Sequence, residues 1–379
     1  MNPDIILGFL NRIFKLFNKN NFSPHKKFKL PKRALIIFPD FIGDAIVLTP
    51  FLRNLRSNLG ASALIDAVCS KSIAEMLLTL PYINHYYPDE YVNKNKRQLL
   101  NNRRYDTVFI LKPSISWAAA TIKERIPQRI TTNLERLGIE SPLFVPVIST
   151  HIIPNTSIKD KTPQIEVNLS MLKHLGMKVQ DTSPEINLKH SDVRKAKSLI
   201  GDNHGLNAMI HLTAGSPGKQ WDIENWLEII KYLALENYKH GKNYRIFATG
   251  AHKDKKIYDD ISKKTGVQII NLCGQTTLRE TVAVYRHMDL VVTTDSAPAH
   301  IAGIAKVPNL VVLYGPTNNH QWFPFAPDSK VEQVYADVPC RPCVSRVCQS
   351  KKCLKEITVD DVNAAIDRCS GLIVRSHAV

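Results

Sequence analysis

The strongest constraint on the fold is a repeated alternation of short apolar runs with segments of helical periodicity. In the first part of the chain, strands are expected at Ala34–Phe38, Ala63–Val68 and Thr107–Leu111, with helices at Ala45–Leu59 and Ile73–Leu78. Strands separated by helices are typical of βαβ units, which build a parallel sheet covered by helices on both faces. The first part is therefore predicted to be a doubly wound α/β unit.

The alternation returns after an irregular stretch at residues 127–165. The expected strands are Ala208–Leu212, Arg245–Ala248, Gln268–Leu272, Leu290–Thr293 and Leu310–Tyr314. The helices between them are Ile223–Ala234, Lys255–Lys264, Leu278–His287 and Ala299–Ala305. Two such series predict an α/β chain of two Rossmann-like domains facing across a cleft, and 379 residues are enough for both. Ligands of such sheets bind at the carboxyl ends of the strands, so the cleft is the expected site.

Four segments are expected along the chain. A basic amphipathic extension occupies residues 1–31, and two Rossmann-like domains follow at 32–190 and 191–355. The second domain includes a cysteine-rich loop at 340–353, and a C-terminal helix is expected within 356–379.

The net charge of the chain indicates which class of partner it binds. There are 50 Lys and Arg against 34 Asp and Glu, a net charge of +16. An excess of this size favours an anionic partner, such as a membrane surface, a phosphorylated ligand or a nucleic acid. The last is disfavoured, because no aromatic-rich basic stripe or nucleic-acid reading motif is present.

The N-terminal segment carries much of this charge. The first 33 residues hold eight Lys or Arg and one Asp, and apolar side chains between Ile5 and Phe17 recur at helical spacing. This predicts a helix lying on an anionic membrane, or else one packed on the protein's own core or on a second copy. No apolar run approaches the roughly 20 residues that span a bilayer, and no secretory signal is seen. We expect a soluble or peripheral intracellular protein whose cysteines are reduced in the cytoplasm.

The turn after the first strand holds a carboxylate. Phe38 is followed by Pro39-Asp40-Phe41-Ile42-Gly43-Asp44, and Asp44 opens a helix. Asp44 either stabilises the positive end of that helix or is a general base at the mouth of the cleft, able to take a proton from an acceptor hydroxyl.

A second turn has the composition of an anion-binding loop. The segment from His211 to Trp221 contains Thr213, Ser216 and Lys219 among small residues. Backbone N–H groups and hydroxyls could approach a phosphate there while Lys219 supplies positive charge. The spacing is not that of a Walker loop, and an ordinary surface loop is the alternative.

A third turn places an acid and a histidine at a helix start. Ser296 follows Asp295 as the expected N-cap, Ala297 and Pro298 begin the helix, and His300 lies in its first turn. The free N–H groups would face an anion, with a sugar hydroxyl as the partner of Asp295. The alternative is a well-capped helix with a buried His300.

Taken in order, these segments resemble glycosyltransferase family 9, the bacterial heptosyltransferases of lipopolysaccharide core assembly. The likeness covers roughly residues 32–370 and includes Asn271–Gly274, Thr277–Glu280, Thr294–Ala302 and Tyr314–Thr317. The family implies a GT-B fold and inverting transfer of a sugar, expected to be heptose from ADP-heptose, to an anionic glycolipid or other saccharide acceptor, without a catalytic metal. The resemblance also implies a cytoplasmic location, peripheral on the inner membrane, and a C-terminal helix that crosses back to the first domain.

The resemblance also implies roles for single residues. Asp44 would be the general base and Lys219 would hold the donor phosphates, assisted by Thr213, Ser216 and the helix start at Ser296–Ala297. Asp295 would contact the donor sugar and His300 the phosphates. Lys253 stands where an acidic, ribose-binding residue is common in the family, and Asp254 is expected to replace it. This departure, like Pro39–Ile42 in place of a basic or Ser-rich stretch, bears on the identity of the donor.

Four cysteines near the C-terminus could form a structural metal site. Cys340, Cys343, Cys348 and Cys353 lie within fourteen residues. Four thiolates can hold Zn²⁺ or iron tetrahedrally, and the alternative is a loop of reduced thiols.

Other functions stay open at this stage. The acceptor could be a protein or the donor another nucleotide sugar. A nucleotide-sugar epimerase or hydrolase could also use the same two domains.

Overall fold

The computed structural model describes residues 27–112, 114–131, 149–151, 153, 161–201, 205–239, 244–343 and 348–370. The N-terminal amphipathic helix predicted between Ile5 and Phe17 lies outside the described residues.

The first half of the molecule is built on a parallel sheet with the strand order β3-β2-β1-β4-β5. Its elements are β1 (Arg33–Ile37), α2 (Ile42–Val47), α3 (Thr49–Leu59), β2 (Leu64–Cys69), α4 (Lys71–Leu77), β3 (His85–Pro88), α5 (Asp89–Val92), α6 (Lys96–Arg103), β4 (Thr107–Ile110), α7 (Ile115–Lys123), β5 (Gln128–Thr131) and α9 (Gln164–His174). In the central strand, Ile36 pairs with Ala67 on one side and Phe109 on the other. Both faces of such a sheet are covered, which is why β1 is one continuous apolar run.

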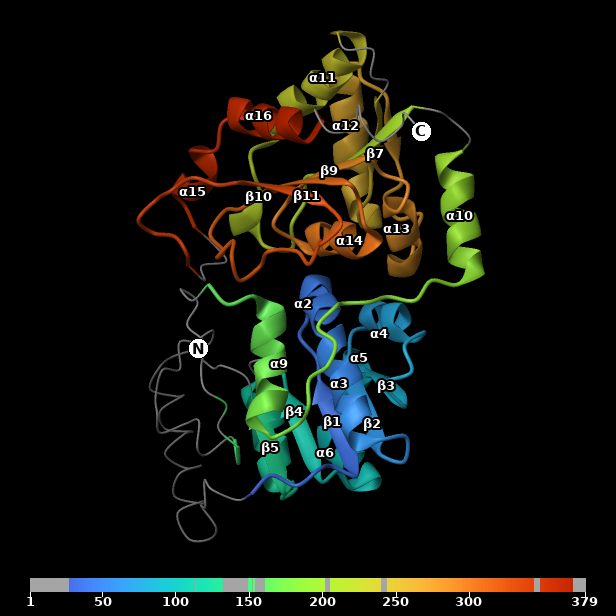
Figure 1. Cartoon of the computed structure of the whole chain (residues 1–379), viewed down its shortest axis with the longest axis vertical. Coiled ribbons are helices and arrows are strands. Elements are labelled where there is room, and N and C mark those ends of the chain that lie inside the picture. Colours follow the sequence, from blue (N-terminus) through green and yellow to red (C-terminus); the bar gives the residue numbers. More distant parts are fainter. Residues whose placement is uncertain are drawn as a thin grey trace.

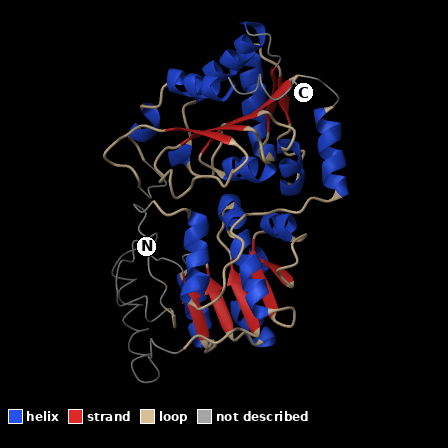
Figure 2. Ribbon diagram, in the orientation of Figure 1, coloured by secondary structure: helices blue, strands red, loops and turns tan. Residues whose placement is uncertain are grey.

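The second half is built on a parallel sheet with the order β11-β10-β9-β6-β7-β8. Its elements are α10 (His190–Ile200), β6 (Leu206–His211), η2 (Pro217–Lys219), α11 (Ile223–Lys239), β7 (Tyr244–Ala248), η3 (His252–Asp254), α12 (Lys255–Thr265), β8 (Ile269–Asn271), α13 (Leu278–Tyr285), β9 (Leu290–Thr294), α14 (Ala297–Ala305), β10 (Asn309–Leu313), β11 (Lys330–Val334), α15 (Lys352–Lys355) and α16 (Val359–Ser370). The strands and helices of both halves stand out in Figure 2. The predicted α/β class is confirmed.

The helix predicted over Ala45–Leu59 is two helices. α2 ends at Val47 and α3 begins at Thr49, with Leu48 between them and Pro50 in the first turn of α3. A proline has no backbone N–H to donate and is tolerated only in the first turn of a helix, so the chain restarts its helix there. The break leaves α2 only six residues long.

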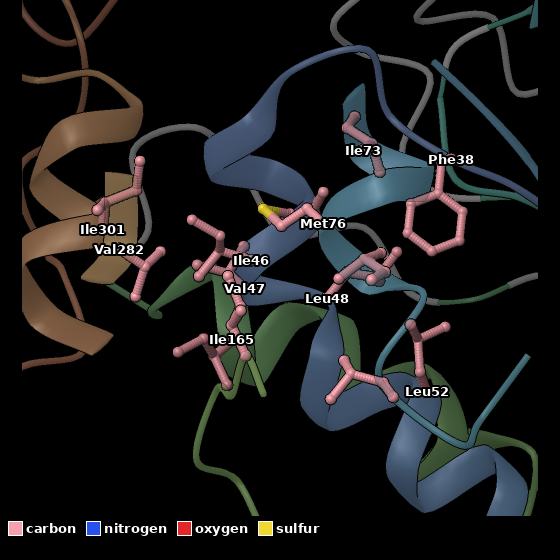
Figure 3. Close-up of a cluster of buried hydrophobic side chains, with 14 of the residues drawn as sticks. Phe38, Ile46, Val47, Leu48, Leu52, Ile73, Met76, Ile165, Val282 and Ile301 are labelled. Atoms are coloured by element: carbon pink, nitrogen blue, oxygen red, sulfur yellow. The ribbon is translucent and has the colours of Figure 1, made fainter. Parts of the chain in front are cut away.

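The two halves meet through the helices that follow the strand ends. In Figure 1, α2 and α4 lie at the top of the first half, directly below α13 and α14 of the second. The contact is apolar: Ile46 and Met76 from below belong to the same buried cluster as Val282 and Ile301 from above, as Figure 3 shows. One hydrophobic core therefore continues from one half into the other.

An arginine adds a polar tie beside this apolar contact. Arg279 in α13 donates from Nε to Asp192 Oδ2 of α10 at 3.0 Å and from Nη1 to the backbone oxygen of Glu75 in α4. Arg279 thus links helices of the two halves.

The C-terminal helix belongs to the second half. α16, which was expected to cross back to the first domain, packs against β10, β11 and α11, and Figure 1 shows it above the second sheet. Val362, Ala365 and Ile366 are buried there, so its apolar stripe is satisfied where it lies. No helix within the described residues has the length and apolarity to cross a membrane.

Candidate active site

Asp44 lies on α2, the short helix that follows the central strand of the first sheet. Its side chain is partly buried, whereas Gly43, Ala45, Ile46 and Val47 around it are buried. Phe41 stands at the N-cap position, and its side chain makes no capping hydrogen bond. The amino end of a helix favours a nearby carboxylate, so both readings of Asp44, stabilising the helix and acting as a base, agree with its place.

Gly43 allows α2 to approach the second half closely. A Cβ atom added at Gly43 would lie 2.9 Å from Cδ2 of His300 and 3.7 Å from the Cα of Ala297, both in α14. Real Cβ atoms do not approach other atoms at 2.9 Å, so only glycine fits here without a shift. The helix that carries Asp44 is therefore packed directly on the helix that follows β9.

His300 is enclosed between these two helices. Its side chain is 4% exposed, and its ring is edge-on to Trp322 at 6.2 Å between centroids. Burial lowers the pKa of His300 to about 4, against an opposing effect of Asp295, while Lys219 lowers it further. The imidazole is thus neutral at neutral pH. Its Nδ1 has no hydrogen-bond partner among the described residues.

Lys219 is paired with Asp295 where two strand ends of the second sheet come together. The Lys219 ammonium lies 2.9 Å from Asp295 Oδ2 and 3.1 Å from the backbone oxygen of the same residue. Thr317, which follows β10, donates its hydroxyl proton to Asp295 Oδ2. Asp295 is 2% exposed, so the carboxylate depends on these donors. An ammonium has three N–H donors, and the third can turn towards a ligand.

The small polar residues around this pair lie at the helix and loop starts that the sequence indicated. Thr213 and Ser216 lie in the loop before η2 and are partly buried. Ser296 stands at the N-cap position of α14 but does not cap it; its hydroxyl donates to the backbone oxygen of Thr294 at 3.3 Å. The side chain of Ser296 therefore does not satisfy the N–H groups at the start of α14, next to Ala297.

Asp254 has a structural contact of its own. Its Oδ2 accepts a hydrogen bond from the backbone N–H of Ala251 at 2.8 Å and so stabilises the turn η3 after β7. The predicted ribose-binding role leaves only its remaining oxygen sites for a ligand.

His211 was not singled out by the sequence and lies near Asp254. It is the last residue of β6; its Nε2 is 3.2 Å from Thr213 Oγ1, and its Nδ1 is unpartnered among the described residues. Burial lowers the pKa of His211 to about 4, partly offset by Asp254. A polar residue that ends a buried strand directly before the loop was the signal that could have found it.

The four cysteines of the C-terminal loop do not form a metal site. Within the described residues, which include all four thiols, no group of three or more His, Cys, Asp or Glu side chains could hold a metal ion. Cys340 is exposed and Cys353 is buried, and Cys348 accepts a hydrogen bond from the backbone N–H of Lys351. This arrangement does not fit the predicted Zn²⁺ or iron, so no role for a metal is derived.

The structure thus brings the predicted residues into two groups. Lys219, Asp295 and the start of α14 meet α2 with Asp44 at the junction of the two halves. Asp254 and His211 form a second group beside the end of β7. A partly buried cation, the N–H groups at a helix start and a carboxylate from the opposite half can together bind an anionic leaving group and remove a proton from a nucleophile.

Two facing Rossmann-like halves with polar groups at their meeting strand ends define the GT-B class of glycosyltransferase folds. A solved structure of this class, described as E. coli ADP-heptose lps heptosyltransferase II, superposes with a TM-score of 0.66 at 19% identity and covers 90% of this chain and 99% of its own.

Residues 94–354 match the model of glycosyltransferase family 9 (heptosyltransferase). The chain belongs to this family. Lipooligosaccharide heptosyltransferase 2 of Campylobacter jejuni is 29% identical over 223 residues, 56% of this chain. That alignment spans 62% of the Campylobacter protein, less than two thirds of its length. Lipopolysaccharide heptosyltransferase 3 of Escherichia coli is 26% identical over 352 residues, 86% of this chain and 96% of its own.

Proposed function

We propose that this chain transfers heptose from ADP-heptose to a lipid-linked lipopolysaccharide core acceptor, with inversion at the anomeric carbon and Asp44 as general base. The observation that carries the proposal is the packing of α2, which holds Asp44, on α14, which begins beside the Lys219–Asp295 pair. A proton acceptor from one half thus adjoins a cationic, N–H-rich group in the other.

In the proposed reaction, the acceptor hydroxyl oxygen attacks the anomeric carbon of the heptose while its proton passes to the Asp44 carboxylate. The bond between that carbon and the diphosphate oxygen breaks, and ADP leaves with the electron pair. A general base of this kind contributes ~10²–10⁴-fold. The charge that grows on the diphosphate is met by Lys219 and by the N–H groups at the start of α14, which need no reorganisation.

Support for the donor comes from the family and its relatives. The structural neighbour described above is named for ADP-heptose, and both relatives are named as heptosyltransferases of lipooligosaccharide or lipopolysaccharide. The net charge of +16 suits a phosphorylated, anionic acceptor. We include in the proposal a location at the cytoplasmic face of the inner membrane, in peripheral contact with anionic lipid.

The test compares Asp44→Asn with Glu90→Gln, a control carboxylate that is exposed at the same edge of the first sheet. Transfer of heptose from ADP-heptose to heptose-deficient lipopolysaccharide is measured together with calorimetric binding of ADP, UDP and GDP. Asp44→Asn should lose at least ~10²-fold in kcat with ADP affinity unchanged, and Glu90→Gln should match the unaltered protein. Retained turnover in Asp44→Asn would exclude Asp44 as the base.

The same measurements separate the alternatives. Selective binding of UDP or GDP would keep the transferase and discard the ADP donor. Transfer only to a protein would replace the glycolipid acceptor. Release of free sugar without any acceptor would favour an epimerase or hydrolase on the same fold.

A further inference from the structure

A lysine ties together three strand ends at the edge of the first sheet that faces the second half. Lys112 follows β4, and its Nζ lies 2.7 Å from Asp40 Oδ1 and 3.0 Å from Asp89 Oδ2. Asp40 belongs to the turn after β1, and Asp89 begins α5 directly after β3. One ammonium therefore joins the segments that leave β1, β3 and β4.

The two ion pairs of Lys112 differ in how far the carboxylate is buried. The side chains of Lys112 and Asp89 are 14% and 18% exposed, whereas that of Asp40 is 64% exposed. Burial acts to lower the pKa of Lys112, but its bonds to Asp40 and Asp89 outweigh this and raise it, so the ammonium stays charged. Asp89 is the enclosed counter-ion. The pair with Asp40 is exposed on the carboxylate side and contributes little to folding.

The Asp40 contact does, however, fix a particular piece of backbone. Asp40 lies four residues before Asp44, at the entrance to α2, a six-residue helix with no side-chain cap at its amino end. Next to Asp40, Phe41 reaches the donor-side loop: a Cβ on Gly215 would lie 3.8 Å from its Cε1. The far side of α2 is held by the contact of Gly43 with His300. Lys112, through Asp40, holds the turn at the amino end of α2.

We propose that Lys112 is a positioning residue for the transfer step: through Asp40 it fixes the entrance of α2 and so the place of the Asp44 carboxylate, with Asp89 as its anchor. This rests on the proposed function, in which Asp44 is the base. The residue acts through the backbone and touches neither substrate. A misplacement of a reacting group by about 1 Å can cost ~10²-fold in rate, so a weak pair can matter for turnover without mattering for stability.

The test uses Lys112→Met, Lys112→Arg and Asp40→Asn, with Lys71→Met as the matched control. Lys71 lies at the same sheet edge, but its side chain is 76% exposed, and its Nζ is as far as 4.0 Å from Oε1 of its partner Glu75. We measure kcat and two KM values for each variant, one for ADP-heptose and one for the acceptor. The acceptor is the one to which the unaltered protein transfers heptose. Hydrogen–deuterium exchange of residues 39–47 is measured in parallel.

We expect kcat to fall ~10–100-fold in Lys112→Met and several-fold in Asp40→Asn, with the KM for ADP-heptose within twofold. Exchange in residues 39–47 should rise in both, Lys112→Arg should recover part of kcat, and Lys71→Met should change nothing. Asp40→Asn removes only an exposed carboxylate, so it tests the idea even if Lys112→Met folds poorly.

Two results would overturn the inference. One is unchanged kcat and exchange in Asp40→Asn and Lys112→Met. The other is a raised acceptor KM with unchanged kcat in Lys112→Met, which would make Lys112 an acceptor-binding residue. Asp44→Asn distinguishes failure of the positioning role from failure of the proposed base. If Asp44→Asn abolishes transfer and Lys112→Met leaves it unchanged, only the positioning role of Lys112 fails. If Asp44→Asn retains turnover, the role of Asp44 as base fails as well.

Discussion

Replacing Lys219 with methionine removes the cation nearest to the buried carboxylate of Asp295. Asp295 is 2% exposed and, among the described residues, would keep only the hydroxyl of Thr317 as a side-chain donor. Breaking a buried ion pair from one side costs about 3–5 kcal/mol. Because the Lys219 side chain is 26% exposed, water can partly replace it, and we expect a loss of about 2–3 kcal/mol in the free energy of unfolding.

For a domain of this size that loss corresponds to a fall of ~4–12 °C in Tm. Urea and thermal unfolding of Lys219→Met are compared with those of Lys219→Met/Asp295→Asn, in which the unpaired charge is gone. The double variant should recover most of the stability. It should not recover ADP binding measured by calorimetry, because the cation expected to meet the diphosphate is still missing.

The reasoning is refuted in either of two ways. Unchanged stability in Lys219→Met would mean that Asp295 does not depend on the lysine. Recovery of ADP affinity in the double variant would mean that Lys219 serves only to neutralise Asp295, and that the diphosphate is held by other groups.

Two further predictions concern α14 and its contact with α2. Because burial lowers the pKa of His300 from 6.5 to about 4, the unfolded chain binds a proton there that the folded chain does not, and stability is lost as pH falls from about 6.5 to 4. His300→Gln should lose less stability over that window, by up to about 3 kcal/mol, in urea titrations at each pH; parallel curves would contradict a neutral, buried imidazole. Gly43→Ala places a methyl group 2.9 Å from the His300 ring, so kcat should fall while ADP binding is kept; unimpaired turnover would show that the contact yields without consequence.

The strands that the sequence missed all lie at the edges of the two sheets. The central strands β1 and β9 are buried on both faces and read as continuous apolar runs. The edge strands β3, β5 and β11, with the sequences HYYP, QRIT and KVEQV, were not predicted, whereas the edge strand β8 was. An edge strand is exposed along one side, so it can carry polar residues that hide it from a search for apolar runs.

For the site, the sequence by itself determined which residues stand at strand ends. Asp44, Lys219 and Asp295 each follow a strand in a parallel sheet, and parallel topology alone brings such positions to one edge. It also located the start of α14, because Pro298 is typical of a first helical turn.

Only the tertiary structure decided how those residues pair. The Lys219–Asp295–Thr317 contacts, the packing of Gly43 on His300 and the tie of Lys112 to Asp40 and Asp89 join residues 22 to 257 positions apart along the chain. Local sequence patterns do not predict contacts between residues so far apart, because these contacts depend on the register of the sheets and on the angle at which the two halves pack. For the same reason, four closely spaced cysteines suggested a metal site that their side-chain geometry does not form.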